Sequence, residues 1–210
     1  MHLYKWEQSF EEFAEMSCND FYKIHQAIWA LFGNRKSERK FLYRVLSQKN
    51  TVTVLIRSFY PITITPTTGK IYSKILNAVL IKGRYQLSAT LNPIIEKSRV
   101  SQGKNNSARV PLIHEQDIKK WLSNLLDKKG FKTEKIETTP VYNSYSRIKK
   151  ATISTCNALG IVEIFDELKA LEAFENGIGK ERSFGYGMLC LTSLKDSITS
   201  SDEDEDYTND

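Results

Sequence analysis

The chain has 210 residues, 40% of them hydrophobic, which is enough to bury the core of one domain or of two small ones. It contains no apolar run long enough to cross a bilayer and no signal-peptide core, so we expect a soluble cytoplasmic protein without membrane association. Cys18, Cys156 and Cys190 are widely spaced and form no Cys-x-x-Cys pair, which argues against a disulfide framework and a zinc knuckle.

The charge is unevenly distributed along the chain. There are 30 Lys and Arg against 25 Asp and Glu, for a net of +5, but six of the acids lie in the last ten residues, so the rest carries 30 against 19, or +11. A basic protein suits a polyanionic partner, because each neutralised phosphate releases condensed counterions. Many basic surfaces serve only solubility, so charge alone leaves nucleic-acid binding open.

The N-terminal part predicts a strand, a helix and a hairpin. Residues 3–8 alternate apolar and polar as a half-buried strand does. Asn19 and Asp20 supply an N-cap for a helix over about 21–32, which Gly33 and Asn34 end. Strands over 41–46 and 51–59, joined by a turn at 47–50, complete half of a ferredoxin-like unit.

The C-terminal part predicts a second set of strands and helices. Its expected elements are a strand at 85–91, a helix at 115–129 ending at Gly130, paired strands within 142–164, a helix at 166–176 and a strand at 188–193. The simplest arrangement is α+β, with two tandem βαββαβ units, although the second helix of the first unit is indistinct. We expect an N-terminal domain over 1–84 that carries the first helix, a C-terminal domain over 85–198, and a disordered acidic tail over 199–210.

Tyr22 and His25 are the candidate catalytic pair. They lie three residues apart, on adjacent turns of one helix face, at the flank of the apolar arc formed by Phe21, Ile24 and Ile28. Imidazole is the side chain best matched to proton transfer at neutral pH. A histidine beside an apolar arc is more often a hydrogen-bonded packing residue, so these residues alone leave catalysis open.

Basic residues in two segments are candidates for phosphate contacts. Arg35, Lys36 and Arg39 follow the first helix and could hold a phosphate near His25, although a solvated basic turn is equally consistent. The polar segment 97–109 is rich in Gly, Asn and Ser and predicts a mobile loop that settles on an RNA backbone. Its candidate RNA-binding residues are Arg99, Lys104 and Arg109.

Two further segments are candidate RNA contacts. Arg147, Lys149 and Lys150 fall in the predicted strand pair, where alternation sends Arg147 and Lys149 to one face that could enter an RNA groove. Residues 177–187 are glycine-rich but follow a helix and lead into a strand, the wrong order for a dinucleotide fingerprint or a P-loop. A structural turn and an RNA contact are both consistent with this loop, and its candidate RNA-binding residues are Gly177, Gly179, Lys180 and Arg182.

A metal-dependent nuclease is disfavoured by the distribution of carboxylates. No acidic or His/Asp cluster has the spacing of a two-metal site, and the densest carboxylate run is the tail. We therefore expect no metal and no small-molecule cofactor.

Six segments in order carry a resemblance to a known family. They are 21–29, 41–45, 92–93, 108–112, 177–180 and 184–189, within a similar region from 21 to 194. Together they resemble the CasE family, the repeat-processing ribonuclease of the type I-E CRISPR surveillance complex Cascade. The chain departs from the family at Ala158-Leu159-Gly160, where the family often has Phe-Glu-Gly, and in its acidic tail.

The resemblance implies two ferredoxin-like, RRM-like domains and metal-independent cleavage at the base of a CRISPR repeat RNA hairpin, with the hairpin retained among the other Cascade subunits. The family's Tyr-x-x-His pair maps onto Tyr22 and His25, its glycine-rich loop onto 177–187, and its basic groove-entering hairpin onto 147–150. The implied reaction is transesterification that leaves a cyclic phosphate.

In that reaction we assign His25 as general acid and Tyr22 to orient the attacking hydroxyl. Arg35, Lys36 and Arg39 would stabilise the charge of the phosphorane. The leading alternative is a non-catalytic RNA-binding or scaffolding subunit on the same fold, and a third reading is a protein-interaction domain with basic surfaces.

Overall fold

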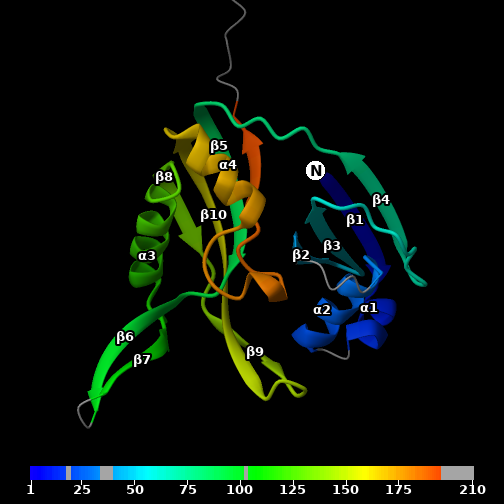
Figure 1. Cartoon of the computed structure of the whole chain (residues 1–210), viewed down its shortest axis with the longest axis horizontal. Helices are drawn as coiled ribbons and strands as arrows, with labels where there is room; N and C mark the ends of the chain where they lie inside the picture. The colour runs from blue at the N-terminus through cyan, green and yellow to red at the C-terminus, as the bar shows by residue number, and fades with distance from the viewer. Residues whose placement is uncertain (18–19, 34–39, 102–103, 195–210) are drawn as a thin grey trace, which may run out of the picture.

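The computed structural model describes residues 1–17, 20–33, 40–101 and 104–194. Two antiparallel sheets lie beside each other, the N-terminal one in blue to teal and the C-terminal one in green to orange (Figure 1). The α+β prediction with two ferredoxin-like units is confirmed. In the part of the chain described, no helix has the length and apolar character needed to span a membrane.

The N-terminal sheet has the strand order β2-β3-β1-β4, and all neighbours are antiparallel. Its elements are β1 (His2–Ser9), α1 (Phe10–Ser17), α2 (Phe21–Ala30), β2 (Phe41–Gln48), β3 (Thr51–Ser58) and β4 (Lys70–Ile75). Val52, Val54 and Ile56 are buried along one face of β3, and Val54 and Ile56 belong to the same core cluster as Ile28 of α2. Residues 59–69 contain no helix, so a loop connects β3 to β4.

The C-terminal sheet repeats the same order as β11-β5-β10-β8. Its elements are β5 (Gly83–Leu91), α3 (Glu115–Asp127), β8 (Phe131–Thr138), β10 (Ala151–Ile164), α4 (Glu167–Asn176), the short 3₁₀ helix η1 (Arg182–Phe184) and β11 (Cys190–Ser193). Both long helices bury apolar side chains against this sheet, for example Leu122 of α3 and Ala170 of α4. The first sheet uses residues 2–75 and the second 83–193; the domain boundary at 84/85 stays a prediction, and the tail lies outside the described residues.

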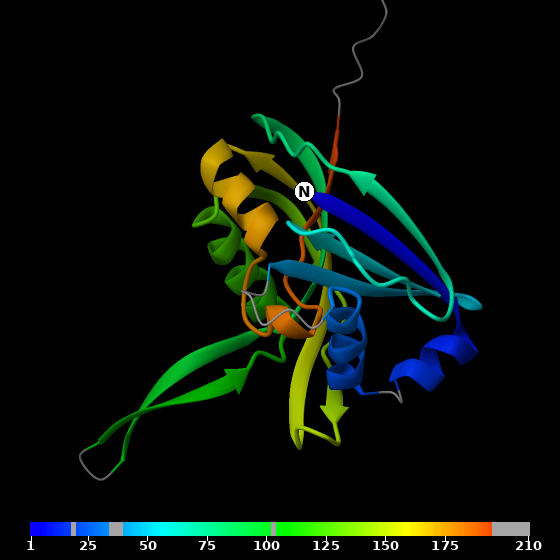
Figure 2. The ribbon, with the colours of Figure 1, turned by 45° about the vertical axis from the view of Figure 1, so that its right-hand side comes forward.

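Two hairpins project from the C-terminal sheet, and both are visible in Figures 1 and 2. The strands β6 (Ile94–Ser101) and β7 (Lys104–Pro111) form one, and β9 (Tyr142–Ser146) with the first part of β10 forms the other. The loop predicted at 97–109 is therefore wrong. Among the described strands β6 and β7 pair only with each other, and the polar sequence of 97–109 has no apolar–polar alternation from which a strand could be predicted.

The predicted position of Arg147, Lys149 and Lys150 inside strands is also wrong. Residues 147–150 form the turn between β9 and β10. The hydroxyl of Ser146 accepts a hydrogen bond from the Lys149 N–H at 3.0 Å, and Lys150 has a φ of 49°, so the chain reverses here and does not continue as a strand.

Two buried arginines of the N-terminal sheet join it to the C-terminal unit. Arg44 of β2 donates to the hydroxyls of Ser88 at 2.8 Å and Thr90 at 3.1 Å. Arg57 of β3 donates to the carbonyls of Leu189 and Phe174, and its guanidinium lies over the Phe174 ring. Burial lowers the pKa of Arg57 to about 10, so it remains charged at neutral pH. These hydrogen bonds fix how the two units meet.

Candidate active site

Helix α2 presents Tyr22 and His25 side by side. Asp20 caps the helix, because its Oδ1 accepts a hydrogen bond from the Tyr22 N–H at 2.9 Å. Phe21 and Ile28 are buried on the inner face, and the two candidates lie half-buried beside it, as the helical period predicts. Their ring centroids are 6.1 Å apart, close enough for both groups to reach one ribose-phosphate unit.

The His25 imidazole is enclosed by aromatic rings from three elements. The ring of Trp29 on α2 lies edge-on at 5.7 Å, Phe184 of η1 lies edge-on at 5.6 Å, and Phe41 of β2 lies nearly parallel at 6.2 Å between centroids. Such contacts restrict the imidazole to one orientation. Sequence reasoning did not single out Phe41 or Phe184 as site residues, although both belong to the segments that carry the family resemblance.

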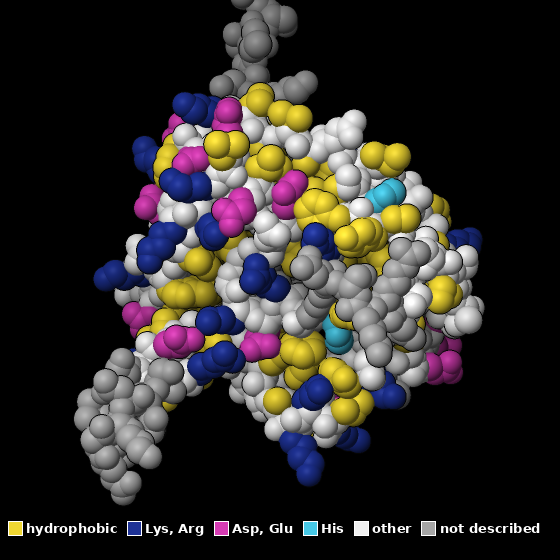
Figure 3. Space-filling view, in the orientation of Figure 1, with side chains coloured by type: hydrophobic (Ala, Val, Ile, Leu, Met, Phe, Trp, Pro, Cys, Tyr) yellow, Lys and Arg dark blue, Asp and Glu magenta, His cyan; other side chains and the backbone are white. Residues whose placement is uncertain are grey.

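The turn at 147–150 reaches the same place. The Lys149 Nζ lies 4.2 Å from the centroid of the Tyr22 ring, a cation–π contact. The side chains of Arg147, Lys149 and Lys150 are all exposed. In Figure 3, Lys and Arg side chains gather around the tip of this hairpin, at the lower edge of the face shown. The structure thus brings one predicted RNA-binding group next to the candidate catalytic pair.

Asp20 connects this turn to α2. Its Oδ2 accepts hydrogen bonds from the backbone N–H groups of Arg147 at 2.8 Å and Ile148 at 3.3 Å. Burial alone raises the pKa of Asp20, but hydrogen bonds from the Ser146 hydroxyl and from the backbone N–H groups of Tyr22, Ile148 and Arg147 outweigh it and hold the pKa below its usual range. The carboxylate is therefore ionised at neutral pH.

The glycine-rich loop supports the site from the other side. The Ile178 N–H donates to the Gly187 carbonyl at 2.9 Å, and the Gly187 N–H donates to the Thr90 carbonyl at 2.7 Å. Gly187 has a φ of +76°, and a Cβ there would lie 1.9 Å from the Ile178 carbonyl oxygen. A Cβ on Gly185 would lie 2.7 Å from the Tyr43 ring. Close packing explains these two glycines, and it sets Phe184 against His25.

The other predicted RNA contacts have more varied positions. Lys180 pairs with Glu96 at 3.0 Å and Arg109 with Glu181 at 3.3 Å, so these ion pairs join the glycine-rich loop to the β6–β7 hairpin. Both ion pairs are solvent-accessible and contribute little stability. Lys180 and Arg109 could therefore leave these carboxylates and bind RNA phosphates instead. RNA binding by Gly177 and Gly179 stays a prediction.

The remaining predicted phosphate contacts are not located by the structure. Arg35, Lys36 and Arg39 lie outside the described residues, and for Arg99 in β6 and Lys104 in β7 only the backbone is described.

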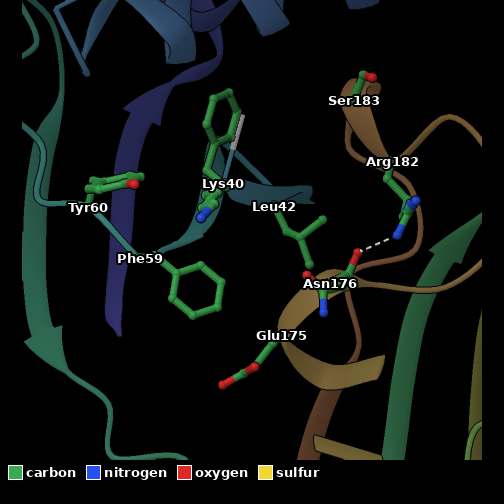
Figure 4. Close-up of a pocket in the computed structure, with 9 residues that line it drawn as sticks. Lys40, Leu42, Phe59, Tyr60, Glu175, Asn176, Arg182 and Ser183 are labelled. Carbon is green, nitrogen blue, oxygen red and sulfur yellow. Dashed lines mark hydrogen bonds between the residues drawn. The ribbon is translucent and has the colours of Figure 1, made fainter. Parts of the chain in front are cut away.

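A cavity of about 630 Å³ lies between the N-terminal sheet and the glycine-rich loop (Figure 4). The exposed rings of Phe59 and Tyr60 lie on one side of it, and Arg182, which donates to the Asn176 carbonyl at 2.9 Å, lies on the other. Phe41, which contacts His25, also lines the cavity. Basic and aromatic groups therefore continue from the candidate pair into this space.

The sequence matches the family model described as CRISPR associated protein over residues 1–192. It is 31% identical over 189 residues to the Escherichia coli K12 protein named CRISPR system Cascade subunit CasE, covering 83% of this chain and 93% of that protein.

Solved structures share the fold. CRISPR endoribonuclease Cse3 bound to a 19-nucleotide RNA has a TM-score of 0.77 at 18% identity and covers 91% of this chain and 100% of that one. Thermus thermophilus Cse3, bound to an RNA representing a pre-cleavage complex, has a TM-score of 0.75 at 17% identity, with 91% and 98% covered. Cas6e from E. coli K-12 has a TM-score of 0.71 at 24% identity, with 92% and 100% covered.

Proposed function

The chain belongs to the CasE family of CRISPR-associated proteins, and we propose that it is an endoribonuclease that binds the stem-loop of CRISPR repeat RNA and cleaves it at the base of the stem. The product hairpin stays bound, and the protein becomes a subunit of Cascade. Two similarities support this: the E. coli relative is named a Cascade subunit, and Cse3 is named an endoribonuclease.

The observation that carries the catalytic part is the convergence of Tyr22, His25 and Lys149. A phenol, an imidazole and an ammonium group from two distant segments meet on one surface. A non-catalytic RNA-binding subunit needs cations and stacking rings, but it needs no imidazole held in one orientation by three aromatic neighbours. This favours the catalytic reading over a scaffolding subunit.

The proposed reaction is transesterification. The ribose 2′ hydroxyl before the cut attacks its own phosphorus, and the bond from phosphorus to the 5′ oxygen of the next nucleotide breaks. His25 donates a proton to that leaving oxygen, and Tyr22 orients the attacking hydroxyl. The upstream product ends in a 2′,3′-cyclic phosphate and the downstream product begins with a free 5′ hydroxyl.

Charge on the pentacoordinate phosphorus is stabilised by cations aimed at it in advance. Lys149 is the candidate among the described residues, because its Nζ already lies beside Tyr22. Arg35, Lys36 and Arg39 remain candidates for the same role. The nucleophile belongs to the substrate, so no metal-bound hydroxide is needed.

RNA binding is assigned first to the turn at 147–150, whose exposed cations match a phosphate-lined groove. The cavity beside Phe41 adds aromatic surface suited to unpaired nucleotides next to the stem. Each phosphate contact displaces counterions, so affinity should fall steeply with salt.

One assay tests the proposal. The purified chain is incubated with its own repeat RNA in excess EDTA, and with a repeat in which one strand of the stem is scrambled. We expect one cut at the base of the intact stem and no cut in the scrambled RNA. Binding of the intact repeat without cleavage would favour the scaffolding subunit, and equal binding of both RNAs would contradict hairpin recognition.

A further inference from the structure

Asp20 makes more hydrogen bonds than a helix cap requires. One carboxylate oxygen caps α2 through the Tyr22 N–H, and the other accepts from the backbone of Arg147 and Ile148, more than 120 residues away in the chain. Asp20 as a whole residue is only 5% exposed, so breaking these bonds would leave a carboxylate charge largely removed from water.

Asp166 shows what an ordinary cap looks like in the same chain. It caps α4 by accepting from the Lys169 N–H at 3.1 Å, and its other oxygen pairs with the Lys169 ammonium at 2.7 Å, three residues along the same helix. Its side chain is 29% exposed. A capping aspartate therefore needs neither burial nor a contact with a second structural element. The hydrogen bonds from Asp20 to the hairpin turn are not explained by capping of α2.

The packing next to Asp20 joins the same two elements. Phe21, the first residue of α2, forms a small core with Ile153 of β10 and Tyr186 of the glycine-rich loop, and Tyr22 and Phe184 pack against it. The Tyr186 hydroxyl lies 2.9 Å from that of Thr155. The start of α2 and the base of the hairpin are thus one packed unit.

Beyond this core, the hairpin tip projects with exposed cationic side chains while its backbone N–H groups point to Asp20. Asp20 is therefore a direct hydrogen-bonded link between this turn and the first turn of α2. Tyr22 lies in that turn and His25 one turn later.

We propose that Asp20 is a positioning residue that couples engagement of the 147–150 turn by hairpin RNA to the alignment of Tyr22 and His25. Cleavage then depends on a correctly seated stem, and an RNA that misses the turn binds without being cut. This inference rests on the proposed function and adds to it a way of distinguishing correctly seated hairpin RNA from other RNA.

Asp20→Ser and Asp20→Asn test the coupling, because both residues are good N-caps and neither can hold the turn as the carboxylate does. We expect hairpin affinity within about threefold of the parent. The single-turnover cleavage rate at saturating protein should fall at least tenfold, since a misplacement of about 1 Å can cost a hundredfold. Asp166→Ser is the matched control and should leave both quantities unchanged.

A double-mutant cycle separates coupling from simple loss of structure. Arg147→Ala combined with Lys150→Ala should lower the single-turnover rate in the parent even at saturating RNA, because the turn is no longer held by phosphates. In the Asp20→Ser background the same change should lower affinity but not reduce the rate further. The proposal would be overturned if the effects of Asp20→Ser and of the Arg147 and Lys150 changes on the rate were fully additive. It would also be overturned if both Asp20 variants cleaved at the parent rate, or if both failed to fold.

A readout without cleavage keeps this inference distinct from the proposed function. A hairpin with deoxyribose at the cut is added to protein with ¹⁵N-labelled histidine, and the imidazole signals of His25 are followed by NMR. We expect these signals to shift in the parent and in Asp166→Ser, and to stay near their free positions in bound Asp20→Ser. The same shift in Asp20→Ser would sink the inference whether or not the parent cuts RNA, whereas a parent that never cuts contradicts only the proposed function.

Discussion

The imidazole of His25 on α2 and the ring of Phe41 on β2 lie nearly parallel, with an interplanar angle of 23° and centroids 6.2 Å apart. Phe41 also stacks on Phe32, with ring centroids 5.1 Å apart, and no ring contact between Phe32 and His25 is found among the described residues. The two phenylalanines are equally buried, at 9% exposure.

This arrangement gives a matched pair of variants. Phe41→Leu removes the ring that orients His25 and should lower the single-turnover cleavage rate about tenfold, with hairpin affinity nearly unchanged. Both Phe41→Leu and Phe32→Leu should lower the free energy of unfolding by about 1 kcal/mol, but Phe32→Leu should leave the cleavage rate within twofold of the parent. Equal effects of both variants on cleavage would show that Phe41 acts only through stability. Chemical denaturation and cleavage kinetics supply the two measurements.

His25→Ala should lower the cleavage rate at least a hundredfold, the usual size of a lost general acid, and should leave hairpin affinity nearly intact. His114→Ala, which removes an exposed histidine before α3, is the control and should cut normally. Cleavage kinetics and a binding titration on the same proteins give both numbers. A parallel loss of affinity and rate in folded His25→Ala would make His25 a binding residue.

The helical period was sufficient to predict where Tyr22 and His25 lie, because the positions of buried and exposed residues along 21–32 follow it. It could not predict what surrounds them. Phe184 and Lys149 reach the pair only through tertiary packing, and nothing local in the sequence relates them to residue 25.

The same distinction explains the elements that were missed. Helix α1 is only eight residues long, too short for a helical period to repeat, and β4 is largely exposed, so it has no apolar alternation. β8 hydrogen-bonds to β10 at the edge of the C-terminal sheet and buries only Phe131 and Ile136, too few positions for an alternation to be recognised. The cap at Asp20 was predictable from its residue type, but its bonds to Arg147 and Ile148 were not.

Two glycines in the glycine-rich loop differ in the space available for a Cβ, and this predicts how well each tolerates substitution by alanine. Gly187 and Gly179 have nearly the same φ, +76° and +74°, but a Cβ on Gly187 meets backbone at 1.9 Å while the nearest atom for Gly179 is 4.0 Å away. Gly187→Ala should therefore destabilise by several kcal/mol and Gly179→Ala by only about 1 kcal/mol. Thermal unfolding checks this, and similar melting temperatures for both would contradict the packing described.

Asp20 should make stability depend on pH in the acid range. Its pKa is lowered in the folded protein, so its contribution is complete above the ordinary carboxyl pKa of about 4 and is lost as the pH falls through the lower folded value. The difference in free energy of unfolding between the parent and Asp20→Asn should be constant from pH 7 to 5 and shrink below about pH 4. Urea titrations at several pH values measure it, and a difference that persists unchanged at pH 3 would contradict an ionised Asp20.

The chemical step is tested most directly on the substrate. Replacing the single ribose before the scissile phosphate with deoxyribose removes the proposed nucleophile and leaves the stem, its phosphates and its groove unchanged. The modified hairpin should bind the protein with the affinity of the parent RNA and remain uncut, and cleavage of the unmodified RNA should persist in excess EDTA because no metal-activated water takes part.

The matched control places the deoxyribose one nucleotide further from the cut, where it should have no effect on the rate. Mass spectrometry of the products should find an upstream fragment ending in a cyclic phosphate and a downstream fragment with a free 5′ hydroxyl. A requirement for added magnesium would contradict the metal-independent mechanism, and cleavage of the substrate that lacks the attacking hydroxyl would mean that water is the nucleophile. Tyr22 and His25 would then have to act on a water molecule and not on the ribose, so the roles assigned to them would be wrong even if both residues proved essential.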